Sequence, residues 1–275
     1  MLSDDEPWSS TFCTDHTTRK AAQVPADRIV LVADLTQRTL IVMPAFNEVA
    51  SVGDVVREVI STLPGIAVLV VDDGSLDDTT SAARAAGALV ATLPFNLGVG
   101  GAMRVGFRYA LENDFDNVVQ IDSDGQHDPR SVPSLLAALD SADLVLGARF
   151  AGEGEYRVRG PRQWAMRSLA GILSHTSKTA LTDTTSGFRA SGPKAVALFA
   201  EHYPAEYLGD TIEALVIASR SGLVIKQVPV AMRPRTGGVP SHNPFKSAAY
   251  LARAGLALIF ALIRPPSTYR VGGSL

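Results

Sequence analysis

Along most of the chain, short apolar runs alternate with longer stretches in which apolar residues repeat at helical spacing. The short runs are typical of buried parallel strands, and the longer stretches are typical of amphipathic helices. Strands are predicted at Thr39–Met43, Ile66–Val71, Ala88–Thr92, Asn117–Ile121, Asp143–Gly147 and Leu223–Val230. Helices are predicted from Ser51 to about Leu63, at Asp77–Ala86, at Gly98–Asn113, from Asp128 to about Leu139, at Arg162–Ser177 and at Gly209–Ser221. This alternation predicts an α/β fold with a doubly wound, mostly parallel sheet and helices on both faces.

Residues at the ends of three predicted helices support these boundaries. Ser51 and Asp54 have a spacing that resembles a capping box at the start of a helix. Gly87 is typical of a C-terminal stop. Asp128 followed by Pro129 is typical of an N-cap and the first residue of a helix.

The segment Gly98-Val99-Gly100-Gly101 resembles part of a dinucleotide-binding fingerprint. However, it follows the third predicted strand rather than the first, and its glycines lack the required spacing. We therefore expect a close backbone approach at the start of a helix. A phosphate bound at that helix N-terminus is the less favoured alternative.

Charge is unevenly distributed, although the net charge of the 275 residues is only −3. Residues 1–213 contain 17 basic and 28 acidic residues, whereas residues 214–275 contain eight basic residues and no acidic one. The basic region includes the apolar segment Ala248–Ile263, whose uninterrupted part is about half the ~20 residues of a spanning helix. This segment is predicted to be a core helix, an oligomer contact or a helix at a membrane interface. The basic residues lack interleaved aromatic residues, which argues against nucleic-acid binding.

The N-terminal residues indicate a cellular compartment rather than a fold. Residues 1–26 are rich in Ser, Thr, Asp and Pro, a composition that predicts a loosely attached leader. They lack the apolar stretch of a secretory signal. The single cysteine, Cys13, leaves no disulfide within the chain, which fits a reducing compartment. We therefore expect a cytoplasmic location, with peripheral attachment to the inner face of the cell membrane through the basic C-terminal region.

Two carboxylates directly follow the apolar run that ends at Ile121. Asp122 and Asp124 therefore lie at the carboxyl end of a strand, where open α/β sheets bind ligands. Close carboxylates repel each other and favour a cation, and these hard oxygen ligands suit Mg²⁺ or Mn²⁺ rather than Zn²⁺. The alternative is a polar turn without a metal. The nearby His127 is a third metal ligand, a sugar contact or a loop histidine with satisfied hydrogen bonds.

Two further polar segments end predicted strands at the same edge of the sheet. The first strand continues into MPAFNE (residues 43–48), and the second ends in VVDDGSLDDT (residues 70–79). Because the carboxyl ends of parallel strands meet at one edge, these segments and the Asp122 and Asp124 pair predict one acidic crevice. Such a crevice binds nucleotides through a metal, and through carboxylates that accept from base N–H groups and ribose hydroxyls.

With these motifs the chain resembles the family 2 glycosyltransferases, which have the GT-A nucleotide-diphosphosugar transferase fold. The resemblance runs from about Leu40 to Ser241. It is carried by MPAFNE, VVDDGSLDDT, NLGVGGAMRVGF (96–107), IDSDGQHDP (121–129), DTTSGFR (183–189) and RPRTGGVPS (233–241). Within the family, the chain is most similar to the polyprenyl-phosphate sugar transferases that resemble dolichyl-phosphate mannose synthase. The resemblance implies a leader at 1–26, a GT-A catalytic domain at 27–242, and a basic, apolar C-terminal helix and tail at 243–275.

The resemblance also implies roles for individual residues. The pocket for the base and ribose of the nucleotide is implied at Pro44, Phe46, Glu48, Val71 and Asp73. The metal is implied at Asp122 and Asp124, and the sugar diphosphate beside Ser123, Gln126, Arg235 and Ser241. Arg149 is implied to face the phosphate of either the donor or the acceptor. The implied catalytic residues are Asp122, Asp124, Arg235, Asp183 and Asp210. Asp183 would organise the acceptor side, whereas Asp210 and Glu213 lie where relatives with hydroxyl acceptors have a catalytic base.

The sequence departs from the family pattern in two places. Phe46 lies where an aromatic residue with a hydroxyl is frequent, so stacking is kept and one hydrogen bond is lost. Relatives often have C-terminal spanning helices, and we expect no such helix from residues 243–275.

The implied activity is that of a metal-dependent, inverting glycosyltransferase. It would move a hexose from a nucleotide-diphosphate sugar, of the GDP-mannose or UDP-glucose class, to a polyprenyl phosphate at a membrane surface. One alternative is the same donor chemistry onto a sugar hydroxyl of a cell-wall or surface polysaccharide. Another is a non-catalytic nucleotide-sugar-binding protein, or a nucleotidyltransferase, although MPAFNE is not the glycine-rich basic loop of that class. A membrane partner protein or a second copy of the chain is a further expected partner.

Overall fold

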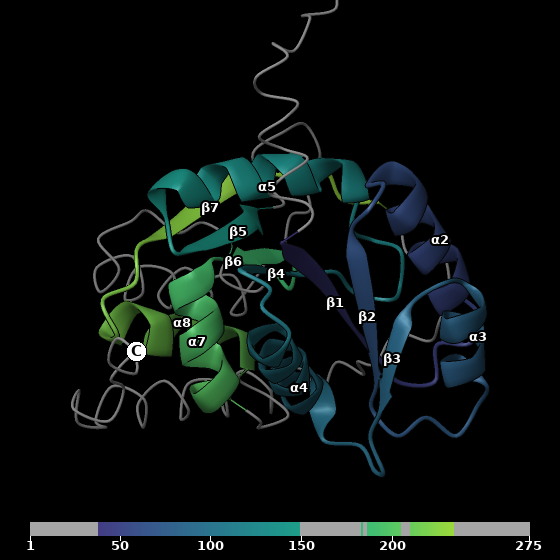
Figure 1. Cartoon of the computed structure of the whole chain (residues 1–275). Helices are drawn as coiled ribbons and strands as arrows, with labels where there is room; N and C mark the ends of the chain where they lie inside the picture. Colours follow the sequence, from purple (N-terminus) through teal and green to yellow (C-terminus); the bar gives the residue numbers. More distant parts are fainter. Residues whose placement is uncertain (1–37, 149–182, 184–185, 205–209, 234–275) are drawn as a thin grey trace, which may run out of the picture.

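The structure, a computed structural model, describes residues 38–148, 183, 186–204 and 210–233. Within these ranges, seven strands form one sheet in the order β3-β2-β1-β4-β6-β5-β7 (Figure 1). The strands are β1 Thr39–Ala45, β2 Ala67–Asp72, β3 Leu89–Thr92, β4 Asn117–Gln120, β5 Leu144–Ala148, β6 Arg189–Ser191 and β7 Ile225–Pro229. The α-helices are α2 Val52–Thr62, α3 Thr79–Ala85, α4 Gly98–Glu112, α5 Val132–Ala138, α7 Pro193–His202 and α8 Asp210–Arg220. Single 3₁₀ turns, η1 Pro129–Ser131 and η2 Leu139–Ser141, flank α5.

The sheet is parallel except at β6. Strand β1 pairs in parallel with β2 and β4, β2 pairs with β3, and β5 pairs with β7. Strand β6 lies antiparallel between β4 and β5, and Arg189 at its start pairs with both Gln120 and Leu146. Strand β6 therefore begins at the edge where β4 and β5 end. The prediction of a mostly parallel sheet is confirmed.

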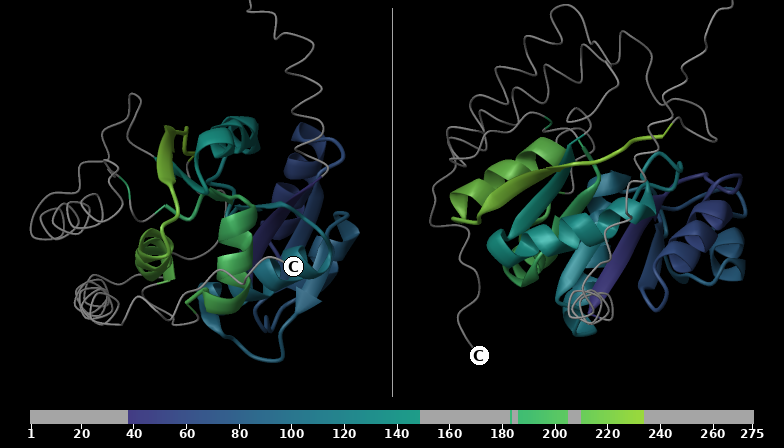
Figure 2. Two further views of the ribbon diagram at one scale, coloured as in Figure 1. Left: turned by 60° about the vertical axis from the view of Figure 1, so that its left-hand side comes forward. Right: turned by 90° about the horizontal axis from the view of Figure 1, so that it is seen from above.

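Alternating residues of the central strands build a separate core on each face of the sheet. Leu40 and Val42 of β1 pack with α4, α7 and α8, whereas Ile41 and Met43 pack with α2, α3 and α5 (Figures 1 and 2). All four side chains are fully buried. Successive strand residues point to opposite faces, so a strand covered on both sides must be apolar throughout. This explains the continuous apolar run of the sequence.

The structure tests the cap and stop residues that were predicted at three helix ends. Gly87, at φ 97°, ends α3 as predicted, with its N–H donating to the Arg84 carbonyl at 3.0 Å. Asp128 caps η1 by accepting from the Arg130 N–H at 3.0 Å, which confirms the predicted start. The predicted capping box is wrong, because the Ser51 hydroxyl donates to the Glu48 carboxylate at 2.8 Å and makes no cap bond to α2.

Two elements of the described chain were not predicted from the sequence. Strand β6 has three residues, too few for an apolar run to stand out. Helix α7 packs against α4, with the Phe199 ring 5.2 Å from the Phe107 ring. The predicted helix Arg162–Ser177, the leader at 1–26 and the C-terminal part at 243–275 lie outside the described residues.

Helix α4 approaches β1 closely at a glycine. A Cβ added to Gly106 would lie 2.4 Å from Cγ1 of Val42, which is buried in the sheet. We expect Gly106→Ala to lower the free energy of unfolding by about 1–3 kcal/mol through overpacking. Urea denaturation measures this difference.

The matched control is Gly53→Ala in α2. A Cβ there would lie no closer than 3.4 Å to any atom, and its nearest neighbour is the flexible end of Arg57. We expect this variant to be at least as stable as the wild type, because alanine favours helix over glycine by up to about 1 kcal/mol. Equal unfolding midpoints for the two variants would contradict the close packing of α4 on β1.

Candidate active site

The loop that follows β4 holds Asp122 in place through its neighbours. The Asp122 N–H donates to Nδ1 of His127 at 3.0 Å, and Nε2 of Gln120 donates to Oδ1 of Asp122 at 3.2 Å. The Asp122 side chain is 39% exposed, so its carboxylate remains accessible at the edge of the sheet. The arrangement fixes the carboxylate without enclosing it.

His127 supports this loop from the protein interior. Its side chain is 3% exposed and stacks on Phe188, with ring centroids 4.8 Å apart. Because Nδ1 accepts from the Asp122 main chain, Nε2 carries the proton in the neutral ring and lies 3.6 Å from Oδ2 of Asp122. This is the third of the alternatives weighed for His127, a buried loop histidine, and here it serves to hold Asp122.

Asp124 lies in a tight turn two residues further on. Its Oδ1 accepts from the Gln126 N–H at 3.0 Å, and Gly125 between them has φ 77°, which favours glycine. Ser123 donates to the Pro44 carbonyl at 3.2 Å and so ties the loop to the end of β1. The predicted residues Pro44, Ser123, Asp124 and Gln126 are thus brought together at one edge.

Gly187 lies against the Asp122 carboxylate. A Cβ at this position would be 3.1 Å from Oδ2 of Asp122 and 3.1 Å from Nε2 of Gln120. The DTTSGFR segment therefore leaves the space that the Asp122 carboxylate occupies. Carboxylate oxygens are hard ligands that suit Mg²⁺ or Mn²⁺, and the Asp122 carboxylate is accessible at the edge of the sheet.

The ends of β1 and β2 are connected by hydrogen bonds. Asn47, at φ 55°, accepts from the Leu76 N–H at 2.8 Å and donates its own N–H to the Ser75 hydroxyl at 2.9 Å. The Glu48 N–H donates to Oγ1 of Thr79 at 2.9 Å. Phe46 is 40% exposed at this rim, so an aromatic face is available to a ligand.

Asp73 is placed beneath this rim rather than on it. Its two carboxylate oxygens accept from the N–H groups of Leu97 and Gly98, each at 2.7 Å, at the start of α4. Burial raises the pKa of Asp73 above its ordinary 3.8, and these two hydrogen bonds partly offset the rise. The expected close backbone approach at Gly98 is confirmed, with Asp73 in the place of a phosphate. Val71 is fully buried in the core that includes α4.

The acceptor-side residues are only partly described. Asp183 is 1% exposed, and its carbonyl accepts from Nε2 of Gln227 at 2.8 Å. Asp210 is the first residue of α8, and Glu213 lies in its first turn. Arg149, Arg235 and Ser241 lie outside the described residues.

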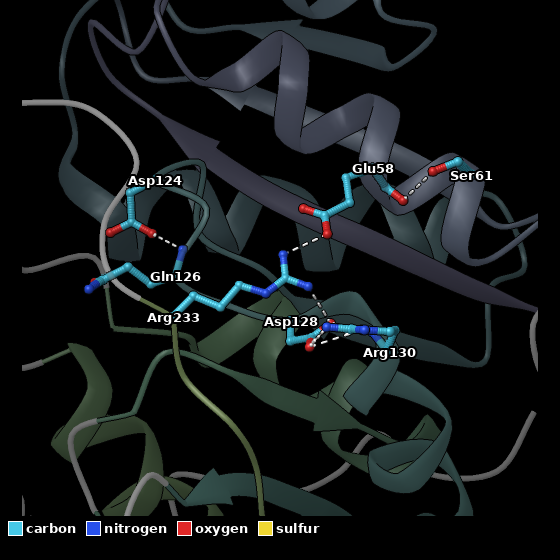
Figure 3. Close-up of polar contacts among 7 residues, drawn as sticks. All are labelled: Glu58, Ser61, Asp124, Gln126, Asp128, Arg130 and Arg233. Atoms are coloured by element: carbon cyan, nitrogen blue, oxygen red, sulfur yellow. Dashed lines mark hydrogen bonds and ion pairs between the residues drawn. The ribbon is translucent and has the colours of Figure 1, made fainter. Parts of the chain in front are cut away.

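The sequence did not predict an ionic network beside the loop (Figure 3). Arg233 donates through Nη1 to Glu58 of α2 at 2.6 Å and through Nη2 to Asp128 at 2.8 Å. Arg130 donates to the same Asp128 carboxylate at 2.8 Å. We call Glu58, Arg233, Asp128 and Arg130 the arginine network. Glu58 and Arg233 lie 175 residues apart in the sequence, so no local pattern could predict that they pair. The sequence shows only that Glu58 lies on a predicted helix and that Arg233 begins the RPRTGGVPS motif.

The arginine network lowers the pKa of Asp128 to about 2 from its ordinary 3.8, first through the Arg130 hydrogen bonds. Because the folded pKa is depressed, the charged form stabilises the fold above about pH 4, and this contribution disappears as the pH falls through about 2. We expect Asp128→Asn, which keeps an N-cap residue, to cost about 1–2 kcal/mol at pH 7. Urea denaturation of both proteins between pH 7 and pH 3 should show the difference shrinking in acid. A difference that does not change with pH would contradict the charge-based origin.

Comparison with known families identifies this arrangement. Residues 40–196 match the family described as Glycosyl transferase family 2. The chain belongs to this family. The undecaprenyl-phosphate mannosyltransferase of Micrococcus luteus is 34% identical over 209 residues, covering 73% of this chain and 86% of that protein. The polyprenol monophosphomannose synthase of Mycolicibacterium smegmatis is 34% identical over 177 residues, covering 56% of this chain and 62% of that protein.

Solved structures confirm the fold expected of a family 2 glycosyltransferase. The glucosyl-3-phosphoglycerate synthase of Mycobacterium tuberculosis, solved with Mn²⁺, UDP and glucosyl-3-phosphoglycerate, superposes with a TM-score of 0.65 at 24% identity. The match covers 85% of each chain. The same enzyme was also solved with Mg²⁺ and UDP, with a TM-score of 0.63. This family 2 chain is therefore a glycosyltransferase with the GT-A fold, as predicted.

Proposed function

We propose that this glycosyltransferase moves a hexose from a nucleotide-diphosphate sugar to a polyprenyl phosphate. The observation that carries the proposal is the loop of Asp122 and Asp124, which holds two carboxylates at the carboxyl edge of the sheet. By their names, one relative is a mannosyltransferase for undecaprenyl phosphate and the other makes polyprenol monophosphomannose. They match 73% and 56% of this chain. Mannose is the hexose that both names indicate.

The donor would bind along this edge. Asp122 and Asp124 would hold a Mg²⁺ or Mn²⁺ ion, and Ser123, Gln126, Arg149, Arg235 and Ser241 would surround the sugar diphosphate. When bound, the ion supplies positive charge for the departing diphosphate. The structural relative was solved with either ion and UDP, which supports this choice of metals.

The base and ribose would occupy the rim formed by β1 and β2. The exposed Phe46 ring offers a face for stacking, and the buried Asp73 supports the start of α4 beneath that rim. Pro44, Glu48 and the main chain at Val71 would complete the pocket. This arrangement fits a purine or a pyrimidine, because every base has a face that stacks on an aromatic ring.

The acceptor chemistry follows from the phosphate. An oxygen of a polyprenyl phosphate is already anionic at neutral pH, so it attacks the anomeric carbon without giving up a proton. The new carbon–oxygen bond forms on one face of the sugar as the bond to the diphosphate oxygen breaks on the other. The nucleoside diphosphate leaves with the electron pair, and the sugar inverts. The enzyme then contributes positioning and electrostatic stabilisation.

A hydroxyl acceptor is the second candidate, since the structural relative makes glucosyl-3-phosphoglycerate. That reaction needs a general base, which typically contributes about 10²–10⁴-fold in rate. We expect Asp210→Asn and Glu213→Gln to retain turnover with polyprenyl phosphate within about tenfold, because an anionic nucleophile needs no base. Initial rates of nucleoside diphosphate release measure this. A loss of about a thousandfold in either variant would favour the hydroxyl acceptor and a basic role for that residue.

Placement at a membrane is part of the proposal, because a polyprenyl phosphate lies in a bilayer. Among the residues that the structure describes, no helix has the length and apolar character needed to cross a membrane. Four basic residues beside the apolar C-terminal segment would attach the protein to anionic lipid at the inner face of the cell membrane: Lys246, Arg253, Arg264 and Arg270. A second copy or a membrane partner protein remains a prediction.

The test is incubation of the whole chain with Mn²⁺ or Mg²⁺ and a panel of nucleotide sugars, with and without polyprenyl phosphate. We expect one donor to give a lipid-linked hexose only when polyprenyl phosphate is present. Transfer to soluble sugars alone would favour the hydroxyl alternative. Donor binding without any turnover would favour a non-catalytic nucleotide-sugar-binding protein.

A further inference from the structure

Arg233 contacts the acidic loop and α2 at three points. Its main-chain N–H donates to the Gln126 carbonyl at 3.0 Å, and its guanidinium bridges Asp128 and Glu58 (Figure 3). The adjacent Met232 forms an antiparallel bridge with His127. The chain at 232–233 therefore runs beside the end of the loop and connects it to α2.

Two of these contacts are made with Gln126 and His127, which also hydrogen-bond Asp124 and Asp122 of the candidate metal site. The Gln126 carbonyl accepts from Arg233, while the Gln126 N–H donates to Oδ1 of Asp124 at 3.0 Å. His127, bridged by Met232, accepts from the Asp122 N–H. The main chain at 232–233 is thus connected to the Asp124 carboxylate through Gln126, and to the main chain of Asp122 through His127.

The placement of the chain at 232–233 depends on the charge of the Arg233 guanidinium. The Asp128 side chain is 10% exposed and that of Arg233 is 29% exposed, so water screens the pair incompletely. Glu58 and Asp128 both face Arg233, and without its guanidinium nothing between them would offset their like charges. Arg130 would remain on Asp128, but its side chain is 72% exposed.

We propose that Arg233 is a positioning residue that sets the affinity of the Asp122 and Asp124 site for its divalent ion. This inference rests on the proposed function, which places the ion between those carboxylates. The guanidinium of Arg233, by binding Asp128 and Glu58, holds the main chain at 232–233 against Gln126 and His127, and it does not act on the substrate. It differs in this from Arg235, for which the family resemblance implies a contact with the diphosphate.

The experiment measures Mn²⁺ binding by electron paramagnetic resonance in the wild type and in Arg233→Ala, with nucleoside diphosphate present. We expect the Kd for Mn²⁺ to rise at least about tenfold, the usual effect of removing an outer partner of a metal ligand. In turnover, we expect the KM for Mn²⁺ to rise by a similar factor, while kcat at saturating Mn²⁺ stays within about threefold. Arg233→Lys should recover part of the affinity, because one amine replaces one of the two guanidinium contacts.

Two further variants complete the design. Arg57→Ala is the matched control, since Arg57 is an exposed arginine of α2 next to Glu58, and its ion pair among the described residues is with Asp54 at 2.5 Å. Its Mn²⁺ affinity should equal that of the wild type. Glu58→Gln removes one anchor of Arg233 and leaves its contact with Asp128, so it should raise the Kd for Mn²⁺ less than Arg233→Ala does. If Arg233→Ala does not fold, Glu58→Gln and Arg233→Lys decide the question.

The outcomes separate the two proposals. A wild type that binds Mn²⁺ and transfers sugar, with unchanged Mn²⁺ affinity in the Arg233 and Glu58 variants, would overturn the role of Arg233 alone. A fall in kcat at saturating Mn²⁺ without a change in affinity would also overturn it. A wild type that binds no divalent ion in the presence of nucleoside diphosphate would overturn both proposals.

Discussion

Asp124→Asn should lower kcat for sugar transfer by at least about a thousandfold. The carboxylate is buried in the turn, where its Oδ1 accepts from the Gln126 N–H. An asparagine oxygen can accept the same bond, so the substitution removes the charge and keeps the shape of the loop. A metal ion and its ligands contribute several kcal/mol to the stabilisation of a charged leaving group. Release of nucleoside diphosphate at saturating donor and acceptor measures the loss.

Asp54→Asn is the control for this prediction. Asp54 is an exposed carboxylate of α2, with a side chain that is 81% exposed, and its removal should leave kcat unchanged. Circular dichroism and urea denaturation of Asp124→Asn should match the wild type closely. Turnover of Asp124→Asn near the wild-type rate would be incompatible with Asp124 as a metal ligand.

The second large effect concerns the acceptor. Replacing polyprenyl phosphate with the corresponding polyprenol should lower the rate of transfer by about 10²–10⁴-fold or more, because the alcohol must lose a proton to a general base. The alcohol also lacks the negative charge that Arg149 and the other basic residues of the proposed site would attract. Thin-layer separation of lipid-linked sugar from both acceptors, presented in the same detergent, measures the ratio.

Competition distinguishes poor chemistry from poor binding in that experiment. We expect excess polyprenol to inhibit transfer to polyprenyl phosphate only weakly, whereas a non-transferable phosphonate of the same chain length should inhibit strongly. Equal rates with the alcohol and the phosphate would contradict the proposed acceptor and would direct attention to the carboxylates of α8.

Local sequence signals located most of the candidate donor side. The apolar runs of β1, β2 and β4 are buried on both faces, so their positions could be predicted within one or two residues. The acids that follow them needed only the rule that parallel strands end at one edge. The sequence could place three residues at the carboxyl end of β4, because they directly follow its apolar run: Asp122, Ser123 and Asp124.

The parts that could not be predicted depend on contacts between distant residues. Ser51 has the sequence of a helix cap, but the Glu48 carboxylate competes for its hydroxyl. Asp73 could be placed at the edge, but not beneath the start of α4, because Leu97 and Gly98 come from a later loop. Arg233 pairs with Glu58 only in the folded protein, because the two residues lie 175 positions apart in the sequence. No local pattern encodes such pairings.

The reversed direction of β6 has a consequence for how this enzyme can change. Strand β5 ends at Ala148, and β6 begins at Arg189 on the same edge, beside Gln120. The last residues before β6 therefore reach the end of β4, where a Cβ at Gly187 would lie 3.1 Å from Oδ2 of Asp122. Any side chain at that position would compete with the carboxylate for space. Changes in the chain that precedes β6 must therefore keep this glycine if Asp122 is to keep its place.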